Sequence, residues 1–540
     1  MAGSGDGTIR AGRADRARAV RRVRGLLWGR VAPTPRRLVA SVVAVAIGAA
    51  GVAMAPAGVA SAAAYDPATD PYSMASVAAN TGATGWWNAG YTGQGVDVAV
   101  IDTGVAPVAG LDGAGKVVYG PDLSLESQAP NLARLDTNGH GTFMAGLIAG
   151  HDSTLTAPYA NAPASAYRGM APDARIVSLK VATADGGADV TQVIAAIDWV
   201  VQHRNDNGLN IRVLNLSYGT NSLQDAAADP LSYAAEQAWQ HGIVVVAAAG
   251  NTGYQRGKGA PGLADPAYNP FVIGVGGYDT MRTTGFNDDV LGAYSASSTG
   301  CGAKCKNPDF VAVGSHLQGL RVPNGYLDAH HPEGLVGTRF FRGSGTSMAA
   351  AVTSGTIALI LQKYPTMTPD QVKRFIADNG KKVPGADSQA QGGGEIDLSV
   401  LATKAPASYT QNLRASKGGG TLDAARGSDH LTANGVTLTG EQDTFGRIVS
   451  TKSLALAEAA GSSWSGGTWN GSTWSGSSWS GSTWSGSSWS GSSWSGSSWS
   501  GSTWSGSSWS GSTWSGSTWS GSSWSGSTWS GSTWAGGTWN

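Results

Sequence analysis

This chain has very few cysteines, and two long stretches of it carry no charged residue. Its 540 residues include two cysteines, Cys301 and Cys305, so no further cysteine exists to complete a thiolate metal site. Residues 38–64 carry no charged side chain, and residues 461–540 carry neither a charge nor a proline. The equal totals of 36 basic and 36 acidic groups therefore hide an uneven distribution, and composition alone divides the chain into regions.

The start of the chain has the pattern of an export signal. Residues 1–37 contain ten arginines against two aspartates, and an apolar run follows at residues 38–55. Small residues at 60–64 form two small-x-small patterns, so we expect cleavage just before Ala63 or Tyr65 and a secreted or surface-attached product. The arginine run suits the basic part of a signal, and no nucleic-acid partner is expected. The alternative is an uncleaved anchor, because the apolar run is long enough to span a bilayer.

The two cysteines of an exported chain most simply form one disulfide, between Cys301 and Cys305. Only three residues separate them, so the bond would close a tight loop. Closing a short loop constrains the unfolded chain less than closing a long one, so little stabilisation is expected. The alternative is a pair of free thiols.

A mostly parallel α/β sheet is predicted for residues 75–402. Four short runs rich in β-branched residues predict buried strands, at 96–101, 176–181, 213–216 and 243–249. The clearest helix begins after Asp189, which has Gln192 at capping-box spacing and apolar residues on one face thereafter. Apolar strands that alternate with helices are typical of a parallel sheet covered by helices on both faces.

Three short motifs supply the residues of one catalytic arrangement. They are VAVIDTG with Asp102, NGHGT with His140 and GSGTSMA with Ser347. A serine hydroxyl is a poor nucleophile until an adjacent base takes its proton, and that base works only if a third group holds its tautomer. Residues 348–361 are small or apolar all round, which predicts a buried helix. Ser347 is then expected at its N-terminus, where unpaired N–H groups favour developing negative charge.

Together these motifs resemble the subtilisin-like serine peptidases, over about residues 75–402. The resemblance implies a subtilisin-like α/β fold and a secreted serine endopeptidase that forms an acyl-enzyme intermediate. Ser347 would attack the scissile carbonyl, His140 would act as base and then acid, and Asp102 would hold the imidazole. It also implies that Asn251, in an AAAGN motif after a predicted strand, donates to the oxyanion with the Ser347 backbone N–H.

The resemblance further implies how a substrate is held. Ser217, Tyr218 and Gly219 resemble the segment that pairs with an extended peptide, and Ala184 to Gly187 resembles the opposing edge. Polypeptides are therefore the expected substrates. No cofactor and no metal site is expected: relatives often bind calcium, but no calcium-ligand pattern can be traced in this sequence.

The chain departs from the family pattern in further places. Phe143-Met144 follows GHGT where the family often has His-Val, and Ala351 stands where the family helix usually has proline. The altered helix is expected to change the backbone beside the nucleophile. Residues 65–74 form only a short extension between the expected cleavage site and the catalytic region. That leaves no room for an inhibitory propeptide domain, so propeptide-assisted folding is not expected.

The C-terminal part has a different composition. Residues 403–460 are rich in Gly, Ala, Ser and Thr and are expected to form a linker without a large core. Residues 461–540 are a five-residue repeat, mostly W-S-G-S-[ST], with 16 of the 21 tryptophans. The repeat is expected either to be a flexible chain or to form a small β-solenoid with one pentapeptide per side. Its regular tryptophans predict attachment to a cell wall, a polymer or another copy.

Two rival functions remain. The first is a catalytically inactive surface-binding or adhesion protein in which the tryptophan repeat is the active part. The second is a serine esterase, which is disfavoured because Ser347 lacks the G-x-S-x-G context of the usual esterase nucleophile.

Overall fold

The computed structural model describes residues 65–473 except 130, 255–261, 299–305, 434–435 and 466, together with three short strands at 488–489, 492–493 and 529–530. The expected export signal (1–64), Cys301, Cys305 and most of the tryptophan repeat therefore lie outside the described residues. Their predictions remain predictions. Of the helices in the described part, none combines the length and the hydropathy that crossing a membrane requires.

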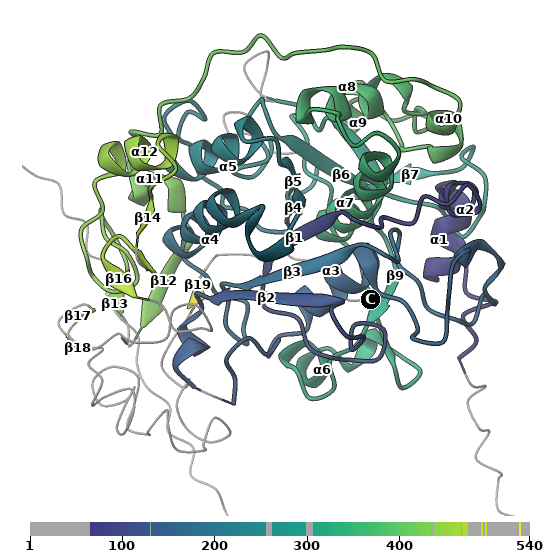
Figure 1. Cartoon of the computed structure of the whole chain (residues 1–540), viewed down its shortest axis with the longest axis horizontal. Coiled ribbons are helices and arrows are strands. Elements are labelled where there is room, and N and C mark those ends of the chain that lie inside the picture. Colours follow the sequence, from purple (N-terminus) through teal and green to yellow (C-terminus); the bar gives the residue numbers. More distant parts are fainter. Residues whose placement is uncertain are drawn as a thin grey trace, which may run out of the picture. The chain divides into compact units, whose positions relative to one another are not determined.

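A central sheet of eight strands organises the molecule (Figure 1). Its order is β2-β3-β1-β4-β5-β6-β7, with β8 beside β6, and every pairing is parallel except that of β6 with β7. The strands are β1 Asp97–Asp102, β2 Val117–Asp122, β3 Arg175–Lys180, β4 Ile211–Leu216, β5 Val244–Ala248, β6 Ile273–Asp279, β7 Val290–Leu291 and β8 Phe310–Val313. The predicted parallel α/β fold is confirmed.

Helices cover both faces of the sheet. Helix α3 (His140–Ala149) packs against α7 (Thr346–Lys363) on one face, whereas α4 (Val190–His203) packs against α5 (Pro230–Gln240) on the other. A second sheet, in the order β10-β11-β9, pairs antiparallel strands Leu335–Val336, Phe340–Gly343 and Leu317–Leu320. The smaller helices of this region are α1 Met74–Asn80, α2 Ala83–Asn88, α6 Tyr326–His330, α8 Pro369–Asn379, α9 Ser388–Gln391 and α10 Leu398–Ala402.

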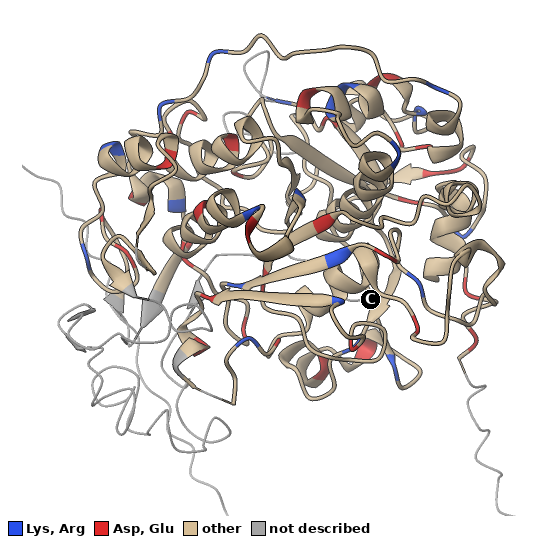
Figure 2. Cartoon of the chain, viewed as in Figure 1, with Lys and Arg blue, Asp and Glu red and all other residues tan. Residues whose placement is uncertain are grey.

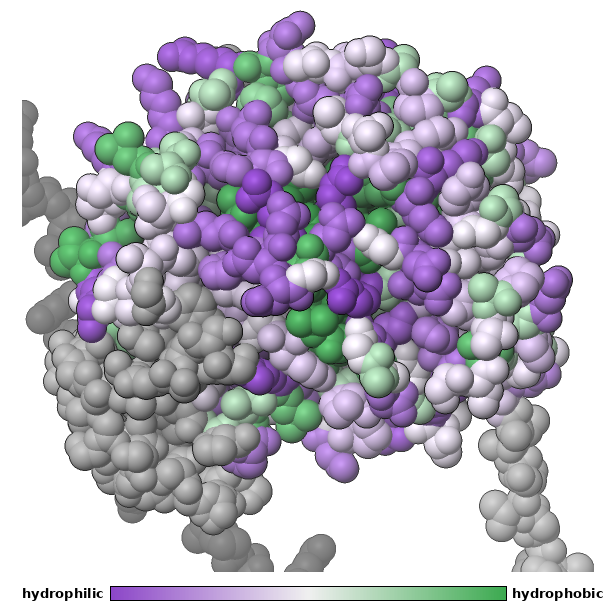
Figure 3. Space-filling model, viewed as in Figure 1, coloured by the Kyte–Doolittle hydropathy of each residue, from purple (hydrophilic) through white to green (hydrophobic). Residues whose placement is uncertain are grey.

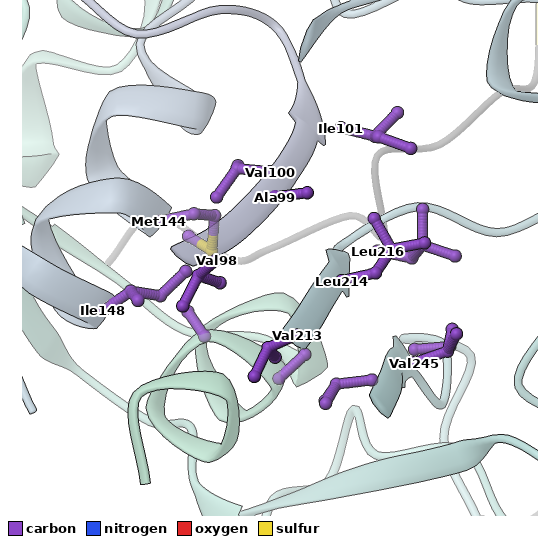
Figure 4. Packing of buried hydrophobic residues seen from close by; sticks show 14 of the residues in the cluster. Val98, Ala99, Val100, Ile101, Met144, Ile148, Val213, Leu214, Leu216 and Val245 are labelled. Atoms are coloured by element: carbon purple, nitrogen blue, oxygen red, sulfur yellow. The ribbon is translucent and has the colours of Figure 1, made fainter. Parts of the chain in front are cut away.

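The core lies where β1, β4 and β5 meet α3 and α7. Every residue of β1 is buried, because the strand has neighbours on both edges and helices on both faces. In Figure 4 the side chains of Val98 and Val213 lie with Met144 and Ile148 of α3 on one side of the sheet, whereas Leu214 and Val245 lie on the other side. Charged residues are spread over helices and loops (Figure 2), and polar side chains cover most of the face in Figure 3.

Local sequence signals give the elements closely. The four predicted strands appear as β1, β3, β4 and β5, shifted by at most two residues at either end. Asp189 caps α4, and both hydrogen bonds of its capping box with Gln192 are formed. Helix α7 is buried from Thr346 to Leu361, as its all-round apolar pattern predicts.

Residues 419–473, which we call the C-terminal segment, pack on α4 and α5. The segment contains α11 Leu422–Arg426, β12 His430–Ala433, β13 Val436–Thr437, α12 Thr451–Ala459, β14 Trp464–Ser465, β15 Thr468–Trp469 and β16 Ser472–Thr473. Helix α11 contacts α4, and α12 contacts α5 (Figure 1). Residues 403–460, expected to lack a large core, thus bury several apolar side chains, which are Leu422, Leu431, Leu438, Phe445 and Val449.

The first two tryptophans of the repeat belong to this packing. Trp464 and Trp469 are buried, and their indole N–H groups donate to Ala195 O and Asp198 Oδ2 of α4 at 2.8 and 2.7 Å. Strands β14, β15 and β16 form an antiparallel sheet, in which Asn470 and Gly471 make the turn with positive φ values of 50° and 71°. These first repeats are thus neither a free chain nor a solenoid. The described part of residues 474–540 is restricted to short strands such as β17 Ser488–Trp489, β18 Ser492–Ser493 and β19 Trp529–Ser530.

Candidate active site

Asp102 and His140 form a direct pair at the carboxyl end of the central sheet. Asp102 is the last residue of β1 and His140 the first of α3, and both are buried. His140 Nδ1 lies 2.9 Å from Asp102 Oδ1 and 3.0 Å from Oδ2. Burial raises the pKa of Asp102, and the neighbouring His140 opposes that shift. The carboxylate is therefore best stabilised when the imidazole is positively charged, which is its state after it has accepted a proton as a base.

Two glycines allow this close approach of helix and strand. A Cβ atom on Gly141 would lie 2.1 Å from the carbonyl oxygen of Gly104, which is backbone and cannot move aside cheaply. Gly104 itself has a φ of +111°, a conformation that glycine adopts without strain. The glycines of the DTG and GHG motifs are therefore steric requirements for the contact between Asp102 and His140.

Asp136 holds the loop that leads into His140, although the sequence analysis did not single it out. Its Oδ1 accepts hydrogen bonds from the Thr103 hydroxyl and from the N–H groups of Asn138 and Gly139, at 2.7 to 3.1 Å. Its Oδ2 accepts from both the N–H and the hydroxyl of Thr142. One buried carboxylate thus ties the end of β1 to the first turn of α3. The signal for it was its place four residues before His140.

Ser347 is the second residue of α7 and is fully buried. Its hydroxyl donates to Ser217 O at 3.4 Å, and the Ser217 hydroxyl donates to Ser347 O at 3.1 Å. Ser217 follows β4 directly, so the nucleophile candidate is tied to the end of that strand. Because α3 and α7 pack against each other, His140 and Ser347 begin two helices of the same layer.

Asn251 lies beside the N-terminus of α7. Its Oδ1 accepts hydrogen bonds from the N–H and the hydroxyl of Thr346, at 2.8 and 3.0 Å. The Thr346 hydroxyl in turn accepts from Gly250 N at 3.1 Å. With its oxygen held by Thr346, the Asn251 amide can present only its NH₂ group to a substrate. Thr346 is a second residue that the sequence analysis did not single out.

The expected substrate edge at residues 184–187 is held at its first residue by polar side chains. Ala184 N donates to Glu126 Oε1, and Ala184 O accepts from Asn138 Nδ2, both at 2.7 Å. Glu126 is itself paired with Lys180, whose Nζ lies 2.8 Å from Oε2. Burial raises the pKa of Glu126, and Lys180 opposes the shift. Glu126 also escaped the sequence analysis, since a single Glu in a short 3₁₀ helix carries no motif.

The Tyr218 side chain is turned into the protein. It is 1% exposed, and burial raises the pKa of its hydroxyl well above the usual value. The Tyr218 ring is therefore not available as a side-chain contact for a substrate. The opposing antiparallel bridge between Thr220 and Asp265 continues this segment, with both hydrogen bonds formed at 2.9 to 3.0 Å.

The structure accounts for both departures near the triad candidates. Phe143 is buried against Gly319 of β9, where a Cβ atom would lie 2.6 Å from its ring. The space that glycine leaves empty is thus filled by phenylalanine. Helix α7 runs unbroken past Ala351, so the absence of proline leaves its N-terminal turn regular.

No metal site was expected from the sequence, although the family resemblance raised the question of calcium. Among the residues that the structure describes, there is no group of three or more His, Cys, Asp or Glu side chains arranged to hold a metal ion.

Comparison with known proteins identifies the family of this chain. Residues 93–394 match the model of the subtilase family of peptidases. The chain is 34% identical over 309 residues to serine protease AprX of Bacillus subtilis, covering 57% of this chain and 66% of that protein. It is 31% identical over 313 residues to subtilisin DY of Bacillus licheniformis, covering 58% of this chain and 93% of the relative.

One solved structure, of a cold adapted subtilisin-like serine proteinase, is 26% identical and covers 57% of this chain and 90% of its own, with a TM-score of 0.41. The family match spans more than half of the chain and contains Asp102, His140, Asn251 and Ser347. The chain belongs to the subtilase family and is a subtilisin-like serine protease.

Proposed function

We propose that this protease is a secreted endopeptidase that uses Asp102, His140 and Ser347 as its catalytic triad. The observation that carries the proposal is the contact of His140 Nδ1 with both oxygens of the buried Asp102. This contact fixes the imidazole tautomer with its proton on Nδ1, so that Nε2 is the basic nitrogen. Nε2 is the atom that must accept the serine proton.

The reaction then follows from the roles of these groups. As the Ser347 oxygen attacks the carbonyl carbon of the peptide, its proton passes to His140 Nε2 and the carbonyl oxygen becomes an oxyanion. The Asn251 amide and the Ser347 N–H donate to that oxyanion. When the intermediate collapses, the amine leaves with the proton from His140. A water molecule then attacks the acyl carbon while His140 takes its proton, and His140 returns that proton to the Ser347 oxygen as the acid leaves.

The substrate is an extended peptide that adds to the backbone of Ser217, Tyr218 and Gly219 on one side and residues 184–187 on the other. The Tyr218 ring is buried and offers no side-chain contact, so pairing with a substrate would use main-chain groups. We expect the reaction to need no cofactor.

Replacement of the nucleophile tests the triad. Ser347→Ala is expected to abolish hydrolysis of casein and labelling by a fluorophosphonate probe, with an unchanged circular dichroism spectrum. Ser354→Ala is the matched control, because Ser354 is a second buried serine on α7 and its hydroxyl bonds to Asn215 Oδ1. That variant should still be labelled. Labelling that persists in Ser347→Ala would falsify the nucleophile assignment.

We further propose that the protein is exported and that its repeat attaches it to a cell wall, a polymer or another copy. The uncharged, tryptophan-periodic sequence motivates this. Deletion of residues 474–540 tests this proposal and spares the buried Trp464 and Trp469, which pack on α4. Wall or matrix retention should fall in the truncated protein while casein hydrolysis stays constant. Equal retention of both forms would rule out attachment through the repeat.

A further inference from the structure

Arg426 is a fully buried arginine that lies outside the segment matched by the family model, which ends at residue 394. Its Nε donates to Asp189 Oδ1 at 2.7 Å, and Nη2 lies 3.3 Å from Asp189 Oδ2. Nη1 and Nη2 also donate to the carbonyl oxygens of Gly440 and Gln442, both at 2.7 Å. The guanidinium therefore links the N-terminus of α4 in the protease core to the loop at residues 440–442 of the C-terminal segment.

On one side this link reaches the first substrate edge. Asp189 caps α4 and lies two residues beyond Gly187, where the edge 184–187 ends. The start of that edge is fixed by the hydrogen bonds of Ala184 with Glu126 and Asn138. Its far end is fixed through Asp189, whose carboxylate bonds both to its own helix at Thr191 N and to Arg426. Loss of Arg426 would leave Asp189, which follows the far end of this edge, without its partner in the C-terminal segment.

Helix α11, which carries Arg426, also contacts the chain next to the second substrate edge. The hydroxyl of Thr220, the residue after Gly219, donates to Ala425 O at 2.6 Å. The Ser222 hydroxyl donates to Ala424 O at 2.8 Å. Helix α11 therefore contacts the chain that continues from Ser217–Gly219, and Arg426 is the residue of α11 that also holds Asp189.

We propose that Arg426 is a positioning residue that fixes the separation of the two substrate edges. The proposal rests on the proposed function, because it takes residues 184–187 and 217–219 as the edges that bind the peptide. Arg426 touches neither the substrate nor Asp102, His140 or Ser347. Its loss should weaken the binding of extended peptides, which use both edges, and should leave the chemistry at Ser347 intact. The C-terminal segment is then part of the substrate-binding architecture, although the family domain ends before it.

The test compares a long and a short substrate in the full-length protein. In Arg426→Met combined with Asp189→Asn, the cap of α4 is kept by asparagine and no buried carboxylate is left unpaired. KM for an eight-residue peptide should rise about tenfold, because ordering the edges must then be achieved on binding. Its kcat, the rate of fluorophosphonate labelling and the hydrolysis of a single-residue p-nitrophenyl ester should stay within about twofold of the parent.

Arg447→Met is the matched control, because Arg447 lies in the same segment but donates to Gly471 O, away from both edges. It should leave the peptide KM unchanged. Should the double variant fail to fold, Arg426→Lys decides the question. It keeps the charge beside Asp189 but cannot donate to Gly440 and Gln442 in the same geometry, so KM should rise about two- to threefold at constant kcat.

An unchanged peptide KM in the double variant, or in Arg426→Lys where the double variant does not fold, would overturn the proposal. So would a loss of peptide hydrolysis matched by an equal loss of labelling, since that indicates general disruption. Failure of the parent protein to be labelled at all would instead refute the proposed catalytic function and is recognisable without any variant.

Discussion

The protease core and the C-terminal segment are held together in different ways. In the core, a mostly parallel sheet is covered by helices, and the apolar residues of β1, β4 and β5 are buried. The C-terminal segment adds apolar side chains of its own, but it is fastened to α4 by buried polar groups: Arg426 on Asp189, and Trp469 on Asp198. Apolar packing tolerates approximate geometry, whereas a buried charge must find its partner. The segment's position is therefore specified by a few contacts.

The same difference governs what could be read from the sequence. Strands, the capping box of α4 and the buried helix α7 follow from local periodicity, so they were predicted to within about two residues. The triad candidates follow from short motifs. The packing of residues 419–473 depends instead on Arg426 and Asp189, which are 237 positions apart, and no local pattern records such a contact. Asp136, Thr346 and Glu126 were missed for the same reason, since their roles lie in their hydrogen-bond partners.

The largest contrast between the two regions should come from the chemical site. Asp102→Asn is expected to lower kcat by roughly 10⁴, because asparagine cannot hold the same imidazole tautomer. Asp102 does not touch the C-terminal segment. Hydrogen exchange of that segment should therefore be the same in the variant and in the parent. A loss of less than about tenfold in peptide hydrolysis would contradict the role of Asp102.

A matched pair of cavity mutations should separate the two regions next. Leu214→Ala in β4 should lower the free energy of unfolding by about 2–5 kcal/mol, measured by urea denaturation in a Ser347→Ala background that prevents autolysis. Leu438→Ala, equally buried but in the C-terminal segment, should mainly speed hydrogen exchange in α11 and α12. If Leu438→Ala exposed β1 and β4 to exchange as strongly as Leu214→Ala does, the two regions would be one cooperative unit.

The attachment of the segment should also depend on pH. Asp198 of α4 and Glu458 of α12 are buried against each other; burial raises the pKa of Asp198 to about 7 and that of Glu458 above its usual range. Tyr233 of α5 faces Glu458 as well, and its pKa is raised by burial and by the charges of Glu458 and Glu236. Because both carboxyls keep protons that the released segment would lose, attachment should be strongest below about pH 4 and weaken as pH rises through 7.

Glu458→Gln isolates this effect, since glutamine can still donate to Asp198 but has no proton to lose. Exchange protection of α12, corrected for intrinsic rates, should fall between pH 5 and pH 8 in the parent, and by clearly less in the variant. Glu333→Gln, a surface replacement far along the chain, serves as the control. Equal pH dependence in the parent and in Glu458→Gln would remove the carboxyl pair as its cause.

The smallest effect is expected for an ion pair on the protein surface. Arg374 and Asp378 of α8 are about half exposed and lie one helical turn apart, with Nε 2.6 Å from Oδ2. Arg374→Ala should change the free energy of unfolding by less than about 0.5 kcal/mol, because solvent screens such pairs. A change above about 1 kcal/mol in the same urea titration would show that exposed ion pairs contribute more to the stability of this protein than we expect.

The packing of Phe143 on Gly319 has a consequence for engineering this protease. The two positions are 176 residues apart in sequence but share one volume, since the ring occupies the space that any side chain at 319 would need. They should therefore be varied as a pair: a smaller residue at 143 tolerates a side chain at 319, whereas either change alone leaves a void or a clash. A library that randomises the two positions separately would miss the compatible combinations beside His140.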